Sequence, residues 1–120
     1  MAKILVIDDD QDMVESIVSI LKDEGYNVGY ALNGSEAIKK AKQQQPDVIL
    51  LDIAMPNMDG YEIFQSLKKE GLQSPVVIIT ARQNGAMNEK ATLCLDEGAY
   101  TILYKPFDPD CLISLIQKAL

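Results

Sequence analysis

The sequence contains no histidine and has two cysteines, Cys94 and Cys111. Without histidine the chain cannot build a Ser/His/Asp or Cys/His catalytic centre, or a zinc site with histidine ligands. Both cysteines fall at apolar positions of helical patterns. We therefore expect two buried, reduced thiols in a cytoplasmic protein.

Long apolar runs and an excess of positive charge are also absent. No run reaches the roughly 20 residues that a membrane-spanning helix needs, and the start of the chain has no secretory signal pattern. The formal net charge is −7 and the pI is near 4.4. This acidic balance argues against non-specific binding of nucleic acid, and it allows docking on a basic partner. We therefore expect no direct contact of this domain with nucleic acid and, from the short apolar runs, none with a membrane.

The 120 residues are 48% hydrophobic, which suits one domain over residues 1–120 with a proper core. Short apolar runs alternate with amphipathic helical patterns. Strands are expected at 3–8, 27–31, 47–52, 76–80 and 100–104. Helices are expected at 11–24, after a capping residue at Asn33, from near Gly60, at 87–97, and after the Asp108-Pro109 pair. This strict alternation predicts a parallel sheet covered by helices on both faces.

The helix after Asp108 has a predicted inner face of five residues. They are Cys111, Leu112, Leu115, Ile116 and Ala119.

Four of the predicted strands end in polar residues. Asp8 and Asp9 lie at the end of the first strand, Asp52 ends the third, Thr80 ends the fourth and Lys105 follows the fifth. In parallel sheets these ends meet at one crevice, where ligands bind. Three crowded carboxylates would repel one another, and a divalent cation such as Mg²⁺ would relieve that repulsion. Asp52 could then act as a nucleophile that forms an acyl phosphate, with the lysine and threonine contacting the phosphoryl oxygens.

Each of these residues alone also has an ordinary structural interpretation, such as a helix cap, a surface lysine or a strand end. Two rival motifs fail on their spacing. A calcium loop starting at Asp8 would need glycine at Met13 and glutamate at Ser19. A haloacid dehalogenase-type phosphatase would need threonine or valine at Asp12, and no glycine-rich phosphate loop is present.

The combined motifs resemble the response-regulator receiver domains of the CheY-like superfamily over the whole chain. The matching segments are Ile4 to Asp9, Asp52 with Met55 to Gly60, Thr80-Ala81, Gly98-Ala99 and Lys105-Pro106-Phe107. The resemblance implies an α/β fold, the flavodoxin-like (βα)5 three-layer sandwich. Its five-stranded parallel sheet would have the order 2-1-3-4-5.

The resemblance also implies a role in two-component phosphorelay signalling. Asp52 would accept a phosphoryl group from a sensor histidine kinase or a histidine phosphotransfer protein. Mg²⁺ (or Mn²⁺) would be held by Asp8, Asp9, Asp52 and the backbone carbonyl of Ala54. Thr80 would be the switch hydroxyl and Lys105 the phosphoryl-binding lysine, in a cis Lys105–Pro106 peptide.

Such a domain is not an enzyme in the usual sense, because it catalyses only its own phosphorylation and dephosphorylation. Its signal would pass to a downstream protein or an attached output domain, with a weak or phosphorylation-dependent homodimer as one option. The alternative is a pseudo-receiver that docks partners without phosphorylation. A phosphatase for outside substrates is disfavoured, because no lid or substrate domain is evident.

Two features depart from the family pattern and bear on the switch. Ile102 stands where the family has a tyrosine or phenylalanine, and Ile has no ring to swing. Thr80 and Lys105 also lie about three residues further apart than expected, which suggests an insertion in 82–88. We therefore predict that phosphorylation reorders residues 82–88 and the start of the following helix.

Overall fold

The computed structural model describes residues 2–55, 58–81 and 86–120. Five parallel strands form the main sheet, in the order β2-β1-β3-β6-β7. These strands are β1 (Lys3–Ile7), β2 (Asn27–Ala31), β3 (Val48–Asp52), β6 (Val76–Ala81) and β7 (Thr101–Lys105). Counted along the chain this is the order 2-1-3-4-5, so the predicted flavodoxin-like fold is confirmed.

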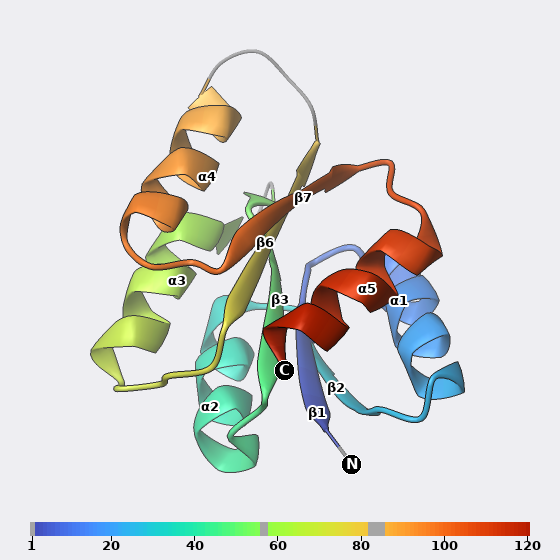
Figure 1. The fold of residues 1–120 in the computed structure, drawn as a ribbon. Helices are drawn as coiled ribbons and strands as arrows, with labels where there is room; N and C mark the ends of the chain where they lie inside the picture. The colour runs from blue at the N-terminus through green and yellow to red at the C-terminus, as the bar shows by residue number, and fades with distance from the viewer. Residues whose placement is uncertain (1, 56–57, 82–85) are drawn as a thin grey trace.

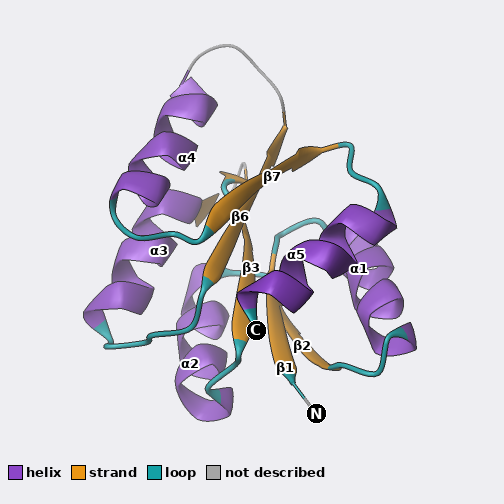
Figure 2. Ribbon diagram, in the orientation of Figure 1, coloured by secondary structure: helices purple, strands orange, loops and turns teal. Residues whose placement is uncertain are grey.

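Helices cover both faces of this sheet (Figure 1). One face carries α1 (Gln11–Asp23) and α5 (Pro109–Ala119). The other carries α2 (Gly34–Gln44), α3 (Gly60–Lys69) and α4 (Ala86–Asp96). The strands lie as a layer between the two groups of helices (Figure 2). The three-layer arrangement follows from the alternating pattern of the sequence.

The alternation of side chains along each strand divides the core in two. On β3, Ile49 and Leu51 pack towards α2, α3 and α4, whereas Val48 and Leu50 pack towards α1 and α5. All five residues of β3 are buried because it is the central strand. Asp52 is the last residue of this strand, so its carboxylate lies at the end of a fully buried segment.

Side-chain caps fix where the helices begin. Asp10 accepts hydrogen bonds from the backbone N–H groups of Asp12 and Met13, at 3.0 and 3.3 Å. Asn33 accepts one from Glu36 at 2.9 Å, as predicted, and Asp108 accepts one from Asp110 at 2.8 Å. These bonds satisfy N–H groups that have no partner within the helix.

One prediction about the cysteines is wrong. Cys94 is buried, but Cys111 is exposed. Leu112 and Ile116 form the buried face of α5, and Cys111 lies one helical step away from it. The apolar pattern alone did not distinguish these adjacent positions.

Two local features were not predicted. A small antiparallel ladder joins β4 (Ala54–Met55) to β5 (Met58–Asp59), between β3 and α3. The residue that caps the C-terminal end of α2, Gln45, adopts a left-handed conformation (φ 46°) that glycine usually supplies. Within the described residues, every helix is too short or too polar to cross a membrane.

Candidate functional site

Two carboxylates lie buried side by side where β1 and β3 end. Asp52 is the last residue of β3 and is 3% exposed, and Asp8 follows β1 and is 2% exposed. The two strands are hydrogen-bonded neighbours in the sheet. The backbone N–H of Asp8 donates to the carbonyl of Ala31 at 3.1 Å, which holds this residue against the end of β2.

The proximity of these two acids changes the protonation of Asp8. Its pKa is raised to about 7, first because burial disfavours the charged form and further because the Asp52 carboxylate lies beside it. The backbone N–H of Asp10, which donates to Asp8 at 3.0 Å, opposes this shift. A bound cation would favour the ionised form of Asp8, which burial and the neighbouring carboxylate disfavour.

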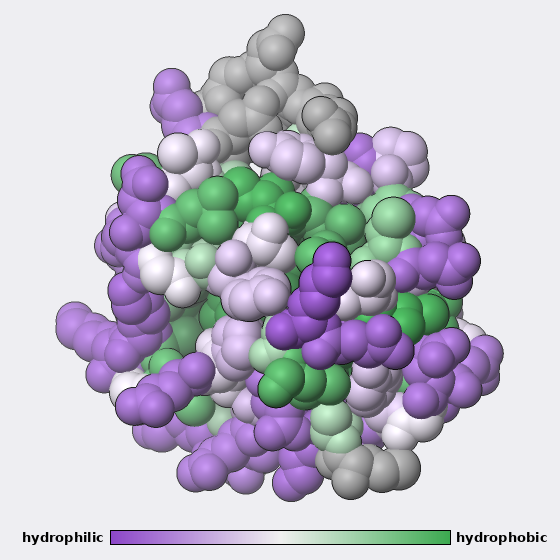
Figure 3. Space-filling model, in the orientation of Figure 1, coloured by the Kyte–Doolittle hydropathy of each residue, from purple (hydrophilic) through white to green (hydrophobic). Residues whose placement is uncertain are grey.

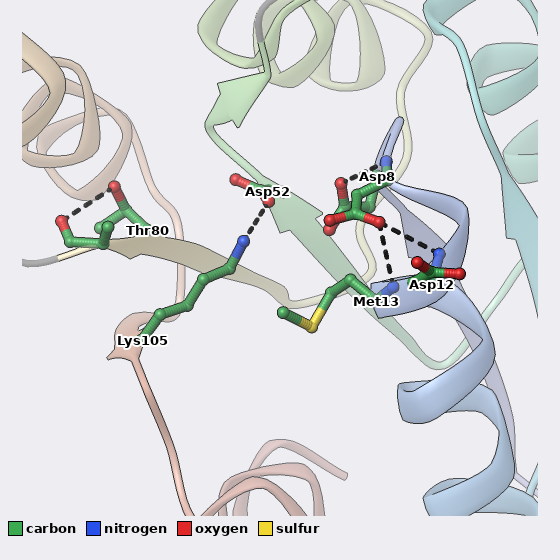
Figure 4. A network of polar contacts seen from close by, with 8 residues as sticks. Asp8, Asp12, Met13, Asp52, Thr80 and Lys105 are labelled. Carbon is green, nitrogen blue, oxygen red and sulfur yellow. Dashed lines mark hydrogen bonds and ion pairs between the residues drawn. The ribbon is translucent and has the colours of Figure 1, made fainter.

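Lys105 brings a positive charge to the buried carboxylate of Asp52. Its Nζ lies 2.6 Å from Asp52 Oδ2, and the lysine side chain is 24% exposed (Figure 4). Lys105 ends β7, which is separated from β3 by β6. Strand ends far apart in the sequence thus meet at the carboxyl edge of the sheet. The Lys105–Pro106 peptide is cis, as predicted.

Thr80 comes from the end of β6 and is fully buried. Its hydroxyl donates to the carbonyl of Ala81 over a long 3.5 Å, on the side away from Asp52 (Figure 4). A bond of this length is weak, so the hydroxyl could exchange it for a better acceptor at low cost.

The donor set suits a hard cation such as Mg²⁺. This ion uses one or two carboxylates and completes its shell with water and phosphate oxygens. Asp8 and Asp52 provide two buried carboxylates, and Asp9, which follows Asp8 in the sequence, is half-buried. Among the described residues, no group of three or more acidic or other metal-binding side chains forms a ready cage. Two residues beyond Asp52, Ala54 lies in β4, in the same loop.

The structure describes Ile102 but only part of the segment 82–88, the two features expected to determine the switch. Ile102 is half-buried and packs against the core on the side of α2, α3 and α4. The loop segment 82–85 lies outside the described residues.

Sequence reasoning missed the part played by Asp59. Its Oδ1 caps α3 by accepting from Tyr61 at 3.0 Å, and its Oδ2 lies 3.1 Å from Nζ of Lys90 on α4. The signal for the cap was present, because an aspartate directly before an apolar helical pattern is a typical helix start. The partner on α4 carries no such local signal.

Residues 4–117 match the family model described as the response regulator receiver domain. The chain belongs to this family. Receivers are signalling domains of two-component systems, and they generally bind Mg²⁺ at their phosphorylation site.

Curated relatives agree with this assignment. The chain is 37% identical over 107 residues to the alkaline phosphatase synthesis transcriptional regulatory protein PhoP of Bacillus subtilis, which covers 89% of this chain and 43% of that protein. It is also 37% identical over 117 residues to the probable transcriptional regulator ycf29 of Porphyra purpurea, covering 96% and 54%. The chain spans about half the length of these curated relatives.

Solved structures give the same fold. The chain superposes on NtrX from Brucella abortus with a TM-score of 0.90 and 33% identity, over 99% of this chain and 27% of that one. It superposes on the chemotaxis protein CheY4 of Vibrio cholerae with a TM-score of 0.87 and 31% identity, over 100% and 99%.

Proposed function

We propose that residues 1–120 act as one phosphoacceptor domain, in which Asp52 takes a phosphoryl group from the phosphohistidine of a sensor kinase or phosphotransfer protein. The observation that carries this proposal is the buried Asp52 carboxylate with Lys105 Nζ at 2.6 Å and Asp8 alongside. A buried nucleophile next to a fixed cation suits phosphoryl transfer, which needs mainly positioning and charge neutralisation.

In the proposed reaction an oxygen of Asp52 attacks phosphorus while the bond to the donor nitrogen breaks. The product is an acyl phosphate on Asp52, and the electron pair leaves with the histidine. Lys105 already contacts the reacting carboxylate, so a short movement of its ammonium group would bring it to a phosphoryl oxygen. The hydroxyl of Thr80 would leave its weak bond to Ala81 and donate to another phosphoryl oxygen.

A divalent cation would be held by Asp8, Asp9, Asp52 and the carbonyl of Ala54, and would supply neutralisation of the phosphoryl charge. Asp8 must lose its proton to bind a cation well. Because its pKa is raised to about 7, the domain should bind the cation more tightly as the pH rises through neutrality.

The signal would pass to a downstream protein or to an attached output domain, and we place this exchange in the cytoplasm. The length of the curated relatives, about twice that of the matched segment, supports an output domain in relatives of this kind. The domain would catalyse its own phosphorylation and dephosphorylation without acting on outside substrates.

The acceptor is tested by Asp52→Asn, which keeps the size of the side chain and removes the nucleophile. Incubation with a small acyl-phosphate donor and Mg²⁺ should phosphorylate the wild-type protein and not this variant, as read by intact mass. Asp47→Asn is the matched control, because Asp47 lies just before the other end of β3 and accepts from the backbone N–H of Lys3 at 2.8 Å. Phosphate on Asp52→Asn at the wild-type level would contradict the assignment, and none on the wild type would favour the pseudo-receiver.

The cation is tested by thermal unfolding with millimolar Mg²⁺ or EDTA. Mg²⁺ should raise the melting temperature by mass action, and Asp9→Ala should weaken this effect. A melting temperature that does not respond to Mg²⁺ would contradict the proposed cation site.

A further inference from the structure

The described side chains that α4 buries in the core are small. Within its described part, Ala91 and Cys94 are buried against the sheet. Two large apolar residues of that part are exposed, Leu93 at 43% and Leu95 at 39%. Apolar surface is visible over α4 and β7 in Figure 3. Small side chains bury little area, so Ala91 and Cys94 contribute less apolar packing than the three large buried residues of α1 do.

Polar contacts to α3 tie the same helix at two levels. Lys90 Nζ lies 3.1 Å from Asp59 Oδ2. At the other end of α4, the hydroxyl of Tyr61 donates to the carboxylate of Glu97, and Nζ of Lys68 donates to the backbone carbonyl of Glu97. Polar contacts of this kind depend on distance and direction, so they respond to small movements of either helix.

The start of α3 in turn rests on the backbone of the phosphoacceptor strand. A methyl group added at Gly60 would lie 2.7 Å from Ile53 Cα and 2.9 Å from the carbonyl oxygen of Asp52. No side chain fits in that space, so the first residue of α3 touches the residues that carry the acceptor. A backbone shift at Asp52 would therefore move the start of α3.

Asp59 joins these two contacts. One of its oxygens caps α3, 3.0 Å from the N–H of Tyr61, and the other holds Lys90. Burial raises the pKa of Asp59. The hydrogen bonds from Lys90 and from the N–H groups of α3 together outweigh this effect, so the pKa lies below its usual value. The carboxylate is thus ionised at neutral pH and available to both helices.

We propose that Asp59 and Lys90 are positioning residues that couple the state of Asp52 to the position of α4. This inference rests on the proposed function. A phosphoryl group at Asp52 shifts the backbone at Ile53, Gly60 transmits that shift to the cap of α3, and the cap moves or releases Lys90. The route needs no ring at position 102, where this chain has isoleucine.

The test is a double-mutant cycle of Asp59→Asn and Lys90→Gln. Asparagine is as good a helix cap as aspartate, so the first change removes the charge and keeps the start of α3. The readout is the change in amide exchange of residues 89–96 when beryllofluoride, an acyl-phosphate mimic, is added with Mg²⁺. We expect each single variant to reduce this change about two- to fivefold, as the loss of a half-exposed ion pair allows. The double variant should be no worse than either single one.

Two further variants separate coupling from simple loss of charge. Lys90→Arg keeps the pair and should restore most of the response. Lys40→Gln removes a comparable pair, Lys40–Glu36 at 2.9 Å on α2, and should leave the response of α4 unchanged.

Additive effects of the two changes, or an unchanged response in both single variants, would overturn the coupling role of this pair. Those results are distinguishable from failure of the proposed function. If the wild-type protein neither binds beryllofluoride nor takes up phosphate, the acceptor assignment is overturned, and the inference with it.

Discussion

The helices α1 and α4 are fixed to the same sheet in different ways. α1 buries three large side chains, Val14, Ile17 and Leu21. In the described part of α4, Ala91 and Cys94 face the core while Leu93 and Leu95 face solvent. Among the described side chains, α1 is therefore fixed mainly by apolar burial, whereas polar contacts with α3 take a larger share in fixing residues 89–96 of α4.

This difference suits the places of the two helices around the site. Asp8 leads directly into the cap of α1, so a firmly packed α1 keeps that acid where it is. Asp52 leads through Gly60 and Asp59 to α4, which can shift at a lower cost in apolar area. We therefore expect the α1 side of the crevice to stay in place and the α4 side to move when Asp52 is phosphorylated.

The largest change in the free energy of unfolding is expected for a substitution in the buried face of α1. Ile17→Ala should lower the free energy of unfolding by about 2–5 kcal/mol, because it removes a buried side chain and leaves a cavity. Leu93→Ala on α4 is the matched control and should change it by about 0.5 kcal/mol or less, since that leucine is 43% exposed. Urea titration of both variants measures the difference. Equal losses would contradict the contrast between the two helices.

A second prediction concerns how burying Asp8, next to α1, lowers the free energy of unfolding. The pKa of Asp8 is raised from 3.8 to about 7, so between these values the folded state binds more protons than the unfolded state. The contribution of Asp8 to the free energy of unfolding therefore falls as the pH rises from about 4 to about 7. Asp8→Asn should remove that fall and, without Mg²⁺, stabilise the protein at neutral pH by up to about 4 kcal/mol.

The measurement is urea unfolding of the wild type and Asp8→Asn at several pH values in EDTA. The difference between the two proteins should grow from pH 4 to pH 7. A difference that is constant with pH would show that Asp8 carries no such cost.

A third prediction tests the close contact between Gly60, at the start of α3, and the backbone that follows Asp52. Gly34 and Gly60 each start a helix, but a methyl group at Gly34 would lie 3.5 Å from the Ile63 side chain, an ordinary contact, whereas one at Gly60 would meet backbone atoms. Gly60→Ala should lower the free energy of unfolding by about 1–3 kcal/mol and slow phosphorylation, because the backbone at Asp52 must move. Gly34→Ala should be close to neutral in both assays. Equal phosphorylation rates in the two variants would contradict the contact described at Gly60.

The smallest effect is expected at the cysteines. Cys111 is exposed and should react with a thiol reagent in the folded protein. Cys94 is buried and its pKa is raised to about 12, first by burial and then by the nearby Glu97 and Asp59 carboxylates, so it should react after unfolding. Cys111→Ser should change the free energy of unfolding by about 0.5 kcal/mol or less. Two thiols that react at equal rates in the folded state would contradict this placement.

The sequence predicted the main sheet and its helices because their signals are local. Caps such as Asn33 and Asp108 and apolar runs such as the one before Asp52 depend on neighbours in the chain. The convergence of Asp8, Asp52 and Lys105 followed from the rule that parallel strands end at the same edge.

The remaining features depend on tertiary contacts that no local pattern records. The pairing of Asp59 with Lys90 joins two helices through side chains alone. The exposure of Cys111 depends on which of two adjacent helical positions faces the sheet. The close approach of Gly60 to Ile53 depends on how α3 packs on β3.

Amide exchange of the wild-type protein with and without beryllofluoride and Mg²⁺ tests the whole account most directly. We predict that without the mimic residues 89–96 of α4 exchange faster than α1, and that adding it changes protection in α4 and at the start of α3 while α1 stays as it was. Equal protection of the two helices, or a response confined to α1, would contradict the account.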